Sequence, residues 1–495
     1  MRSYRFVMLS VTMASTISEA AQIGPFPAGA EVEAAAEGEL VLSPGTLVAG
    51  KDTLAADYGT LVVRENRSDP GSRLIQLPVL RVRAARREDP VPLFSLRGGP
   101  GATNVAGFSP WFFEGRDVVM VGYRGIDGSV RLAAPEIAEA FTSGGDPLGP
   151  EYIARLRRAS LTAFRRLESE GIHMDSYTIL DVAEDIDAAR RALGYNEINL
   201  WGHSYGCHVA HIYGLGHPDN VNRTFISGST GPDAMAVWEP RVIARVLRQY
   251  SEIWNRDPSL AKREPDLLGA MRRALASLPV TWEGVTVDPG RVRVMTFWQL
   301  YNNGTAAQVF DAYVSANEGD YAGLAYLSAT FDQTMSGLVE WGDNFSKTYS
   351  SSDVHSRLPH IADDREPDSV IGSPVAMWIM HPPGGGGWPI RTIPGSLRTG
   401  VSPVETLVLN GGLDVSSPLE YTRRNLMPRL ARGRLIVLDT MGHNDLYNLQ
   451  EDAYRHTLER WLKEGVVDTS RFADVPVDLA ARPRLGDLAR RMFGQ

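Results

Sequence analysis

The chain has a single cysteine among its 495 residues, Cys207, so no disulfide bond can form within it. Acidic residues outnumber lysines and arginines by 59 to 50 and no basic block stands out, which leaves no electrostatic footprint for nucleic-acid binding. No later segment approaches about 20 consecutive apolar residues, so no membrane span is predicted. Internal repeats are lacking, and the glycine-rich run at 382–387 lacks the Lys-Ser/Thr ending of a phosphate-binding loop.

The N-terminus has the pattern of a secretory signal peptide. Arg2 and Arg5 precede the apolar segment 6–14, and a small-x-small site follows at 18–20. Residues 1–20 are therefore predicted to direct export to the periplasm or the medium; a disordered tail on a cytoplasmic protein is the alternative. Residues 21–57, rich in Ala, Gly and Glu, predict an irregular arm.

Apolar runs alternate with helical patterns along much of the chain, which is typical of a mostly parallel sheet with helices on its faces. Two early alternating runs joined by a turn at Asp69-Pro70-Gly71 predict a hairpin at a sheet edge. The predicted organisation is one α/β sheet domain, 58–231 and 403–495, split after about the sixth strand by a helical cap at 232–402. The strand-like runs lie at 60–64, 74–82, 91–96, 118–121, 198–201, 224–228, 405–410 and 435–439, and a clear helical pattern lies at 179–193.

The pentapeptide Gly202-His203-Ser204-Tyr205-Gly206 lies between one of these strands and a helix-like stretch. Strand, sharp turn and helix are the context in which G-x-S-x-G forms a nucleophile elbow, with the serine hydroxyl projecting above the sheet. The two glycines are needed because side chains at their positions would collide in so tight a turn. Ser204 is therefore the predicted nucleophile.

A serine hydroxyl becomes a useful nucleophile only when an imidazole removes its proton and an acid fixes the imidazole. Downstream, Asp414 and His443 each follow one of the two returning strands. Both are expected at the carboxyl edge of the sheet, where Ser204 also lies and where open α/β sheets bind ligands. Ser204, Asp414 and His443 are the predicted catalytic residues.

Other residues fit these roles less well. Asp439 is a rival acid, but it is close to His443 in sequence and ends its strand, which favours a structural role. His208 and His211 lie on the helix after the elbow and are expected to be packed or hydrogen-bonded there. With Cys207 they would form a metal cluster only if they converged on a buried helix, so no metal and no cofactor is predicted.

A tetrahedral oxyanion needs two backbone N–H groups directed at it. One is expected from Tyr205, at the start of the elbow helix. The other is expected from Gly99, in the loop Arg97-Gly98-Gly99-Pro100-Gly101 that directly follows a strand. The glycine pair lets the backbone approach a substrate carbonyl closely.

Taken together, these motifs resemble the prolyl iminopeptidase and tripeptidyl aminopeptidase group of α/β-hydrolases. The resemblance implies an α/β-hydrolase fold with Ser204, Asp414 and His443 as the triad and the Gly98-Gly99 loop as oxyanion hole. Arg97 stands where the family usually has His, Gly122-Tyr123 where an acid and a polar residue are common, and His203 where Gly is frequent. The matching segments are 96–101, 118–129, 182–206, 409–418 and 441–443; the cap matches only as a helical insertion.

The resemblance implies an aminopeptidase that releases N-terminal residues from short peptides. Such an enzyme needs cap acids to hold the substrate ammonium, and Asp332, Glu340 and Asp343 are the candidates, with Glu340 and Asp332 put forward. A solvated helix face is the alternative for these acids. A carboxylesterase and an inactive hydrolase-fold binding protein are the alternative functions, and the oligomeric state is left open.

Overall fold

The computed structural model describes residues 23–106, 110–352, 369–376 and 387–494. The predicted signal peptide at 1–20 lies outside the described residues, as does most of the glycine-rich run at 382–387. Within the described residues, no helix is both long enough and apolar enough to cross a bilayer.

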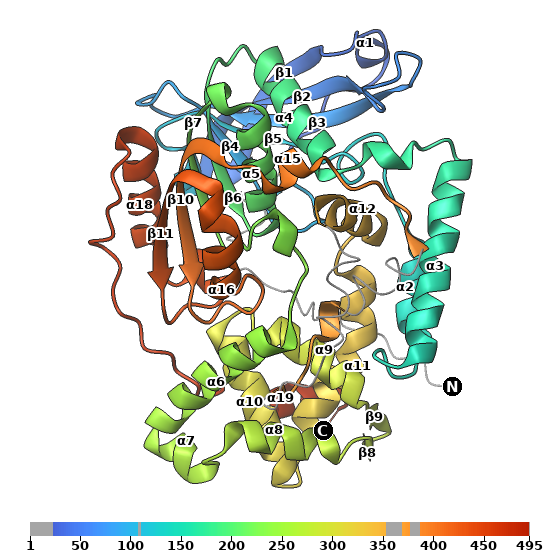
Figure 1. Cartoon of the computed structure of the whole chain (residues 1–495), viewed down its shortest axis with the longest axis vertical. Helices are drawn as coiled ribbons and strands as arrows, with labels where there is room; N and C mark the ends of the chain where they lie inside the picture. Colours follow the sequence, from blue (N-terminus) through green and yellow to red (C-terminus); the bar gives the residue numbers. More distant parts are fainter. Residues whose placement is uncertain (1–22, 107–109, 353–368, 377–386, 495) are drawn as a thin grey trace.

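A nine-stranded sheet forms the centre of the molecule, in the spatial order β1-β2-β3-β5-β4-β6-β7-β10-β11 (Figure 1). The first three strands run antiparallel to their neighbours, and the pairs from β5 to β11 are parallel. The strands are β1 (Leu40–Ala49), β2 (Asp52–Arg64), β3 (Leu74–Val82), β4 (Leu93–Leu96), β5 (Val118–Val121), β6 (Ile198–His203), β7 (Val221–Ser227), β10 (Ser402–Gly411) and β11 (Leu430–Leu438). The predicted mostly parallel α/β sheet is confirmed.

The central strands are short, apolar and buried along their length, as expected for parallel strands covered on both faces. Helices α4 (Ile179–Ala192) and α5 (Tyr205–Gly216) cover one face. Helix α18 (Glu451–Glu464) covers the other, where Trp461 donates from its indole nitrogen to the carbonyl of Thr224 in β7. The helical pattern at 179–193 is confirmed, and Thr178 begins α4 through a capping box with Asp181.

The prediction of an irregular arm at 21–57 is wrong for its second half. Residues from Leu40 onward form β1 and the first half of β2, and β1, not the β2–β3 hairpin, is the sheet edge. Pro44-Gly45 interrupts the alternation of β1 and so conceals the strand in the sequence. Proline is tolerated there because β1 is an edge strand with one unpaired side.

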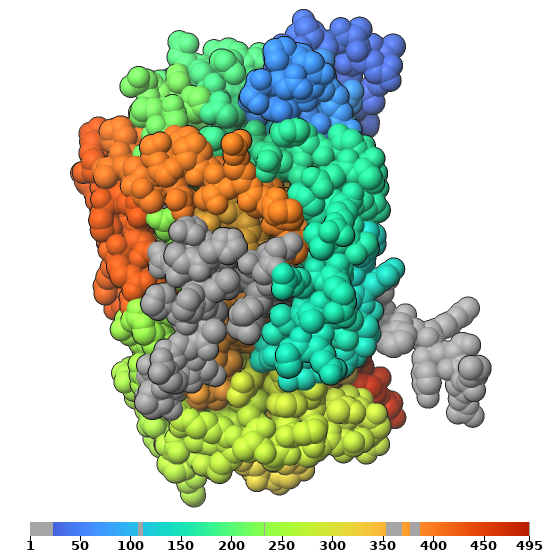
Figure 2. Space-filling view, turned by 45° about the vertical axis from the view of Figure 1, so that its right-hand side comes forward, coloured from blue at the N-terminus to red at the C-terminus, as the bar shows by residue number. Residues whose placement is uncertain are grey.

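The cap is built from three separate parts of the chain. Its main part follows β7, the strand at the predicted 224–228 run, which is seventh in the chain because β1 precedes the predicted six, and it includes a small β8–β9 hairpin. Helices α2 and α3, which precede β6 in sequence, share one apolar core with the inserted helices, and so does α19 near the C-terminus. Figure 2 shows the α2–α3 segment (teal) against the inserted helices (yellow-green).

The helices of this cap are α2 (Pro135–Thr142), α3 (Pro150–Ser169), α6 (Pro240–Arg256), α7 (Pro258–Arg263), α8 (Leu267–Ala276), α9 (Pro289–Gln299), α10 (Asn303–Asn317), α11 (Ala322–Gly337), α12 (Trp341–Ser351) and α19 (Leu485–Met492), and its strands are β8 (Val280–Trp282) and β9 (Val285–Val287). The remaining short helices are α1 (Ala30–Glu33), α15 (Gly395–Thr399), α16 (Leu419–Tyr421) and α17 (Asp445–Asn448).

Candidate active site

Ser204 lies between the end of β6 and the start of α5, in the strand–turn–helix that the sequence predicts. Its backbone has φ 55° and ψ −120°, a conformation that costs a non-glycine residue about 1–3 kcal/mol and persists only where the surroundings impose it. The surroundings do impose it, because strand and helix touch at the flanking glycines. A Cβ on Gly202 would lie 2.9 Å from the backbone of Gly206, and one on Gly206 would overlap the carbonyl oxygen of Leu96. The serine hydroxyl is thus presented at the carboxyl edge of the sheet.

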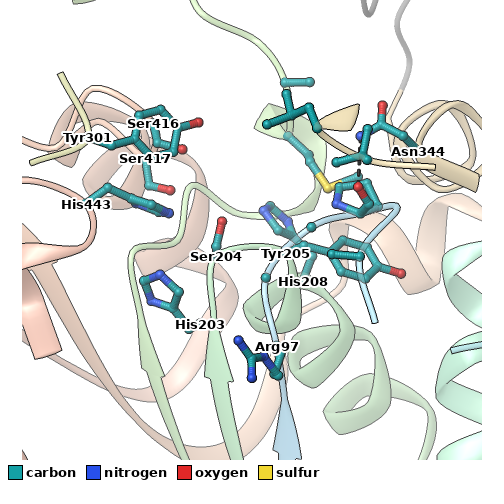
Figure 3. Close-up of a pocket in the computed structure, with 18 of the residues that line it drawn as sticks. Arg97, His203, Ser204, Tyr205, His208, Tyr301, Asn344, Ser416, Ser417 and His443 are labelled. Atoms are coloured by element: carbon teal, nitrogen blue, oxygen red, sulfur yellow. Dashed lines mark hydrogen bonds between the residues drawn. The ribbon is translucent and has the colours of Figure 1, made fainter. Parts of the chain in front are cut away.

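Asp414 follows β10 and His443 follows β11, so two neighbouring parallel strands bring them to this same edge. His443 Nδ1 lies 2.8 Å from Asp414 Oδ2, and the backbone N–H of Ser417 donates to Asp414 Oδ1 at 2.6 Å. A carboxylate oxygen only accepts, so Nδ1 carries the hydrogen, and the neutral form of this imidazole has its lone pair on Nε2. In Figure 3 the His443 ring faces the Ser204 hydroxyl. The structure therefore brings together the three residues that the sequence singles out.

The alternatives for these roles do not assemble. Asp439 is exposed, whereas Asp414 is fully buried behind His443. Cys207 donates its thiol to the carbonyl of Ser227 at 3.2 Å. Within the described part of the chain no three His, Cys, Asp or Glu side chains are grouped so as to hold a metal ion.

Three neighbours fix the position of the His443 ring. Gly228, directly after β7, has φ 66°, and a Cβ there would lie 2.8 Å from Cε1 of His443. The ring of His203 packs against that of His443 with centroids 4.8 Å apart, and Tyr301 from the cap contacts it edge-on at 5.1 Å. Burial, together with the nearby His443 and the positive charge of Arg97, holds the pKa of His203 well below its usual value. His203 is therefore uncharged and does not oppose protonation of His443.

The loop after β4 lies beside the elbow. A Cβ on Gly98 would lie 3.2 Å from Cβ of Ser204, so a side chain at this position would press on the serine. Gly99 and Tyr205 both line the same cavity as Ser204, and Tyr205 is the first residue of α5, where backbone N–H groups have no partner within the helix. Both predicted oxyanion donors are therefore placed around the serine.

Asn104 organises this loop and was not predicted from the sequence. Its side-chain Oδ1 accepts from the N–H of Arg97 at 2.8 Å, and its Nδ2 donates to the carbonyls of Ser95 and Val121. Its own N–H donates to the Asp127 carboxylate at 3.0 Å. The sequence shows only that a polar residue follows the Gly-Gly-Pro-Gly loop. It does not show that the Asn104 amide bonds to two different strands, β4 and β5.

Ser204 and His443 open on a cavity of about 360 Å³, within the range of small-molecule sites. The sheet domain forms its floor and the cap forms much of its walls. Near His443 the walls include Tyr301, which contacts the His443 ring, and Trp298, which contacts Tyr301. Trp238, which donates to the carbonyl of Ser416, and Trp341 of α12 also line the cavity. On the opposite side of Ser204 lie Tyr205, His208 and Asn344 (Figure 3). The other polar lining groups are Arg97, Thr103, His203, Thr230, Thr348, Ser416, Ser417, Asn444 and Tyr447.

The predicted substrate-binding acids do not lie in this cavity. Glu340 accepts a hydrogen bond from the backbone N–H of Ala134 at 3.0 Å, and Asp332 pairs with Arg291 at 2.9 Å. Neither contributes to the cavity lining. The prediction fails because the partners of both acids come from distant parts of the chain, which sequence neighbours cannot reveal.

The third cap acid, Asp343, is fully buried and paired with Lys347 on the same helix. Among the described residues that line the cavity there is no Asp and no Glu. The charged group among them is Arg97, whose pKa is lowered by burial. The described lining thus offers uncharged hydrogen-bonding groups in place of carboxylates.

The sheet order, the elbow and the strand-end residues define an α/β-hydrolase fold. Residues 92–264 match the family model described as alpha/beta hydrolase fold. This match covers β4 to β7, including the elbow, and confirms the fold that the sequence motifs imply.

Two curated relatives match the chain in part. They are tripeptidyl aminopeptidases of Streptomyces coelicolor and Streptomyces lividans, each 26% identical over 195 residues. The match spans 36% of this chain and 36% of each relative's length. It confirms the resemblance to the tripeptidyl aminopeptidase group at the level of an α/β-hydrolase. Among solved structures, a meta-cleavage product hydrolase from Pseudomonas fluorescens is 12% identical, with 79% of this chain and 96% of that chain covered at a TM-score of 0.37.

Proposed function

We propose that this protein is a serine hydrolase that cleaves acyl bonds through Ser204, His443 and Asp414. The observation that carries the proposal is the 2.8 Å contact from Asp414 Oδ2 to His443 Nδ1 beside a serine held in an elbow conformation. Structural roles alone would not require a strained serine, a buried carboxylate and an imidazole to meet at one cavity.

In the proposed reaction the Ser204 hydroxyl attacks the acyl carbonyl while Nε2 of His443 takes its proton. Asp414 keeps the hydrogen on Nδ1 and stabilises the imidazolium that forms. His443 then gives its proton to the leaving group, and an acyl-enzyme remains on Ser204. Water, activated by the same imidazole, releases the acyl group and restores the serine.

The negative oxygen of each tetrahedral intermediate is proposed to bind the N–H groups of Gly99 and Tyr205. Removing one such donor from a serine hydrolase typically costs 10²–10³ in kcat. The Asn104 hydrogen bonds support this role, because they fix the loop that carries Gly99 before substrate arrives.

The first substrate class we propose is short peptides cleaved near their N-terminus. It is supported by the partial likeness to the two tripeptidyl aminopeptidases. The second is carboxylic esters, favoured by a cavity whose described lining has aromatic walls and lacks a carboxylate for a free ammonium. An ester or an amide with no charged amine requires no such carboxylate.

A paired panel of aminoacyl- and peptidyl-anilides and aryl esters tests the proposal. We expect turnover of at least one series, and we expect Ser204→Ala to lower kcat/KM by about 10⁴-fold or more because the nucleophile is gone. Ser169→Ala, an exposed serine at the end of α3, serves as the matched control. A fluorophosphonate should label the wild type at Ser204.

If Ser204→Ala keeps activity within tenfold of the wild type, Ser204 is not the nucleophile and the proposed mechanism is rejected. An unlabelled and inactive wild type would support the hydrolase-fold binding protein. Cleavage of esters alone would retain the mechanism and reject the peptidase.

A further inference from the structure

His208 lies in the first turn of α5, four residues after Ser204. Its side chain is only 4% exposed and lines the cavity. Figure 3 shows its ring beside Ser204, on the side away from His443. Within the described residues its buried Nδ1 has no hydrogen-bond partner. Its other ring nitrogen, Nε2, is not among the inaccessible unpaired atoms, so the ring, which lines the cavity, is able to pair with a ligand bound there.

The imidazole of His208 is uncharged. Burial and the neighbouring His211 lower its pKa to about 3. A neutral imidazole has one N–H donor and one lone-pair acceptor, so it can pair with a polar group without bringing a charge into the cavity.

Asn344 of α12 supplies a second uncharged group from the cap. Its Nδ2 donates to the carbonyl of Pro100 at 3.0 Å, which fixes the amide because a carbonyl cannot donate. Its Oδ1 is buried and has no partner in the described part of the chain. An amide oxygen only accepts, so the group that pairs with it must carry N–H or O–H.

The place of these two residues assigns them to one part of the substrate. His443 must reach the leaving group to protonate it, so the leaving group lies on the His443 side of Ser204. The acyl group then lies on the side of His208 and Asn344 (Figure 3). A free ammonium on the acyl group would find no carboxylate among the described lining residues to neutralise its charge.

Building on the proposed serine hydrolase function, we propose that His208 and Asn344 form a subsite for acyl groups that carry an uncharged N–H or O–H donor. An amide N–H, as in an acyl group whose own nitrogen is acylated, and a hydroxyl are the two sources of this donor. His208 is thereby a specificity-determining residue.

Matched pairs of 4-nitrophenyl esters test the subsite. N-acetylglycine and 4-oxopentanoate esters differ only by N–H in place of CH₂, and 3-hydroxybutanoate and 3-methylbutanoate esters differ by OH in place of CH₃. The free glycine ester tests the ammonium. After correction for spontaneous hydrolysis, we expect the wild type to favour the donor-bearing member of at least one pair by about tenfold in kcat/KM. The favoured pair identifies the donor as N–H or O–H.

His208→Leu should reduce this ratio at least fivefold, and His208→Gln, which keeps a hydrogen-bonding group, should retain most of it. His211→Leu is the matched control, because His211 lies one turn further along α5, is equally buried, and has two unpaired ring nitrogens but does not line the cavity. It should leave the ratio unchanged.

Three results would overturn the subsite: ratios near one in the wild type, a ratio that survives His208→Leu, or fastest cleavage of the free glycine ester. If no ester is hydrolysed, the serine hydrolase function fails separately. The subsite is then decided by calorimetry on Ser204→Ala, where the amide of N-acetylglycine should bind about tenfold more tightly than 4-oxopentanamide.

Discussion

At the scale of single residues, the most constrained position is that of the His443 ring. Its Nδ1 is held by Asp414, one face packs on His203, and Gly228 closes the space beside Cε1. His203 is itself held, because its Nδ1 lies 3.1 Å from the Ser227 hydroxyl. The imidazole therefore has little freedom to rotate. Its position relative to Ser204 depends on the space that Gly228, which has no side chain, leaves beside it.

We expect Gly228→Ala to impair catalysis through the position of this ring. The new methyl group would lie 2.8 Å from Cε1 and 3.0 Å from Nδ1 of His443, too close for the ring to stay in place. A displacement of about 1 Å can cost about 10²-fold in rate. The measurement is kcat/KM on the best ester of the panel.

Gly194→Ala is the control for backbone strain. Gly194 has φ 75°, similar to the 66° of Gly228, but a Cβ there would have no atom within 4 Å. Both variants should lose about 1 kcal/mol of stability, the cost of forcing alanine to positive φ. Only Gly228→Ala should lose activity; equal activity in the two variants would contradict the steric argument.

At this scale the sequence predicts residues whose roles follow from their position at strand ends. Ser204, Asp414 and His443 were found because each follows an apolar run in the required order. Glu340 and Asp332 were misjudged, and Asn104 was missed, because pairing depends on which backbone atoms the fold brings near them. A local pattern contains no information on such partners.

At the scale of elements, α12 joins the cap to the sheet domain through polar side chains. The helix is buried along its length. Asn344 donates to the carbonyl of Pro100 in the 97–101 loop, the Lys347 ammonium donates to the carbonyl of Arg124 at 2.8 Å, and Ser350 accepts from the first N–H of α4. Because one helix makes all these contacts, it fixes the 97–101 loop relative to the cap.

The Asp343–Lys347 pair in α12 gives stability a pH dependence. Burial, only partly offset by Lys347, raises the pKa of Asp343 to about 6, against 3.8 for an ordinary Asp. The folded state therefore binds this proton more tightly than the unfolded state, so the contribution of Asp343 to stability falls as pH rises from about 4 to 6. Relative to Asp343→Asn, the wild-type free energy of unfolding should decline over that range and level off above it, as urea titrations would measure.

Asp57→Asn provides the matched comparison. Burial would raise the pKa of Asp57, but the hydrogen bonds and charges of Arg83 and Arg81 outweigh it and the pKa is lowered. Its stabilisation is lost only as pH falls below about 4, so the difference between this variant and the wild type should be flat from pH 4.5 to 8. A wild-type stability that rises with pH relative to Asp343→Asn would refute the role given to Asp343.

Among the elements, the strands with unbroken apolar runs were predicted and β1 was not. The proline at Pro44 and the exposed residues of an edge strand remove the alternation on which strand prediction depends. The predicted first part of the sheet domain, 58–231, includes the residues of α2 and α3, which pack in the cap core. Their apolar faces do not specify which layer they cover, and that choice is made by packing.

At the scale of the whole molecule, the chain leaves the cap and returns to it. After α18 on the sheet, residues 465–484 run along the molecule to α19, which packs on α11 at the far end (Figure 1). Leu485 and Ala489 are buried there in the cap core. The C-terminal segment thus connects the two layers whose relative position shapes the cavity.

Removing α19 should destabilise the cap while leaving the hydrolase machinery of the sheet domain in place. A chain ending at Pro483 loses the burial of Leu485 and Ala489 and exposes part of α11, which should lower Tm by about 5–10 °C and speed proteolysis within the cap. Fluorophosphonate labelling should persist because Ser204 and His443 follow sheet strands, whereas KM should rise because cap residues form much of the cavity wall.

Arg490→Ala is the control for this truncation. Both side chains of its ion pair with Asp320 are more than a third exposed, so the pair contributes less than about 1 kcal/mol and Tm should hardly change. A shortened chain with wild-type Tm and KM would show that the cap is held by its inserted helices alone.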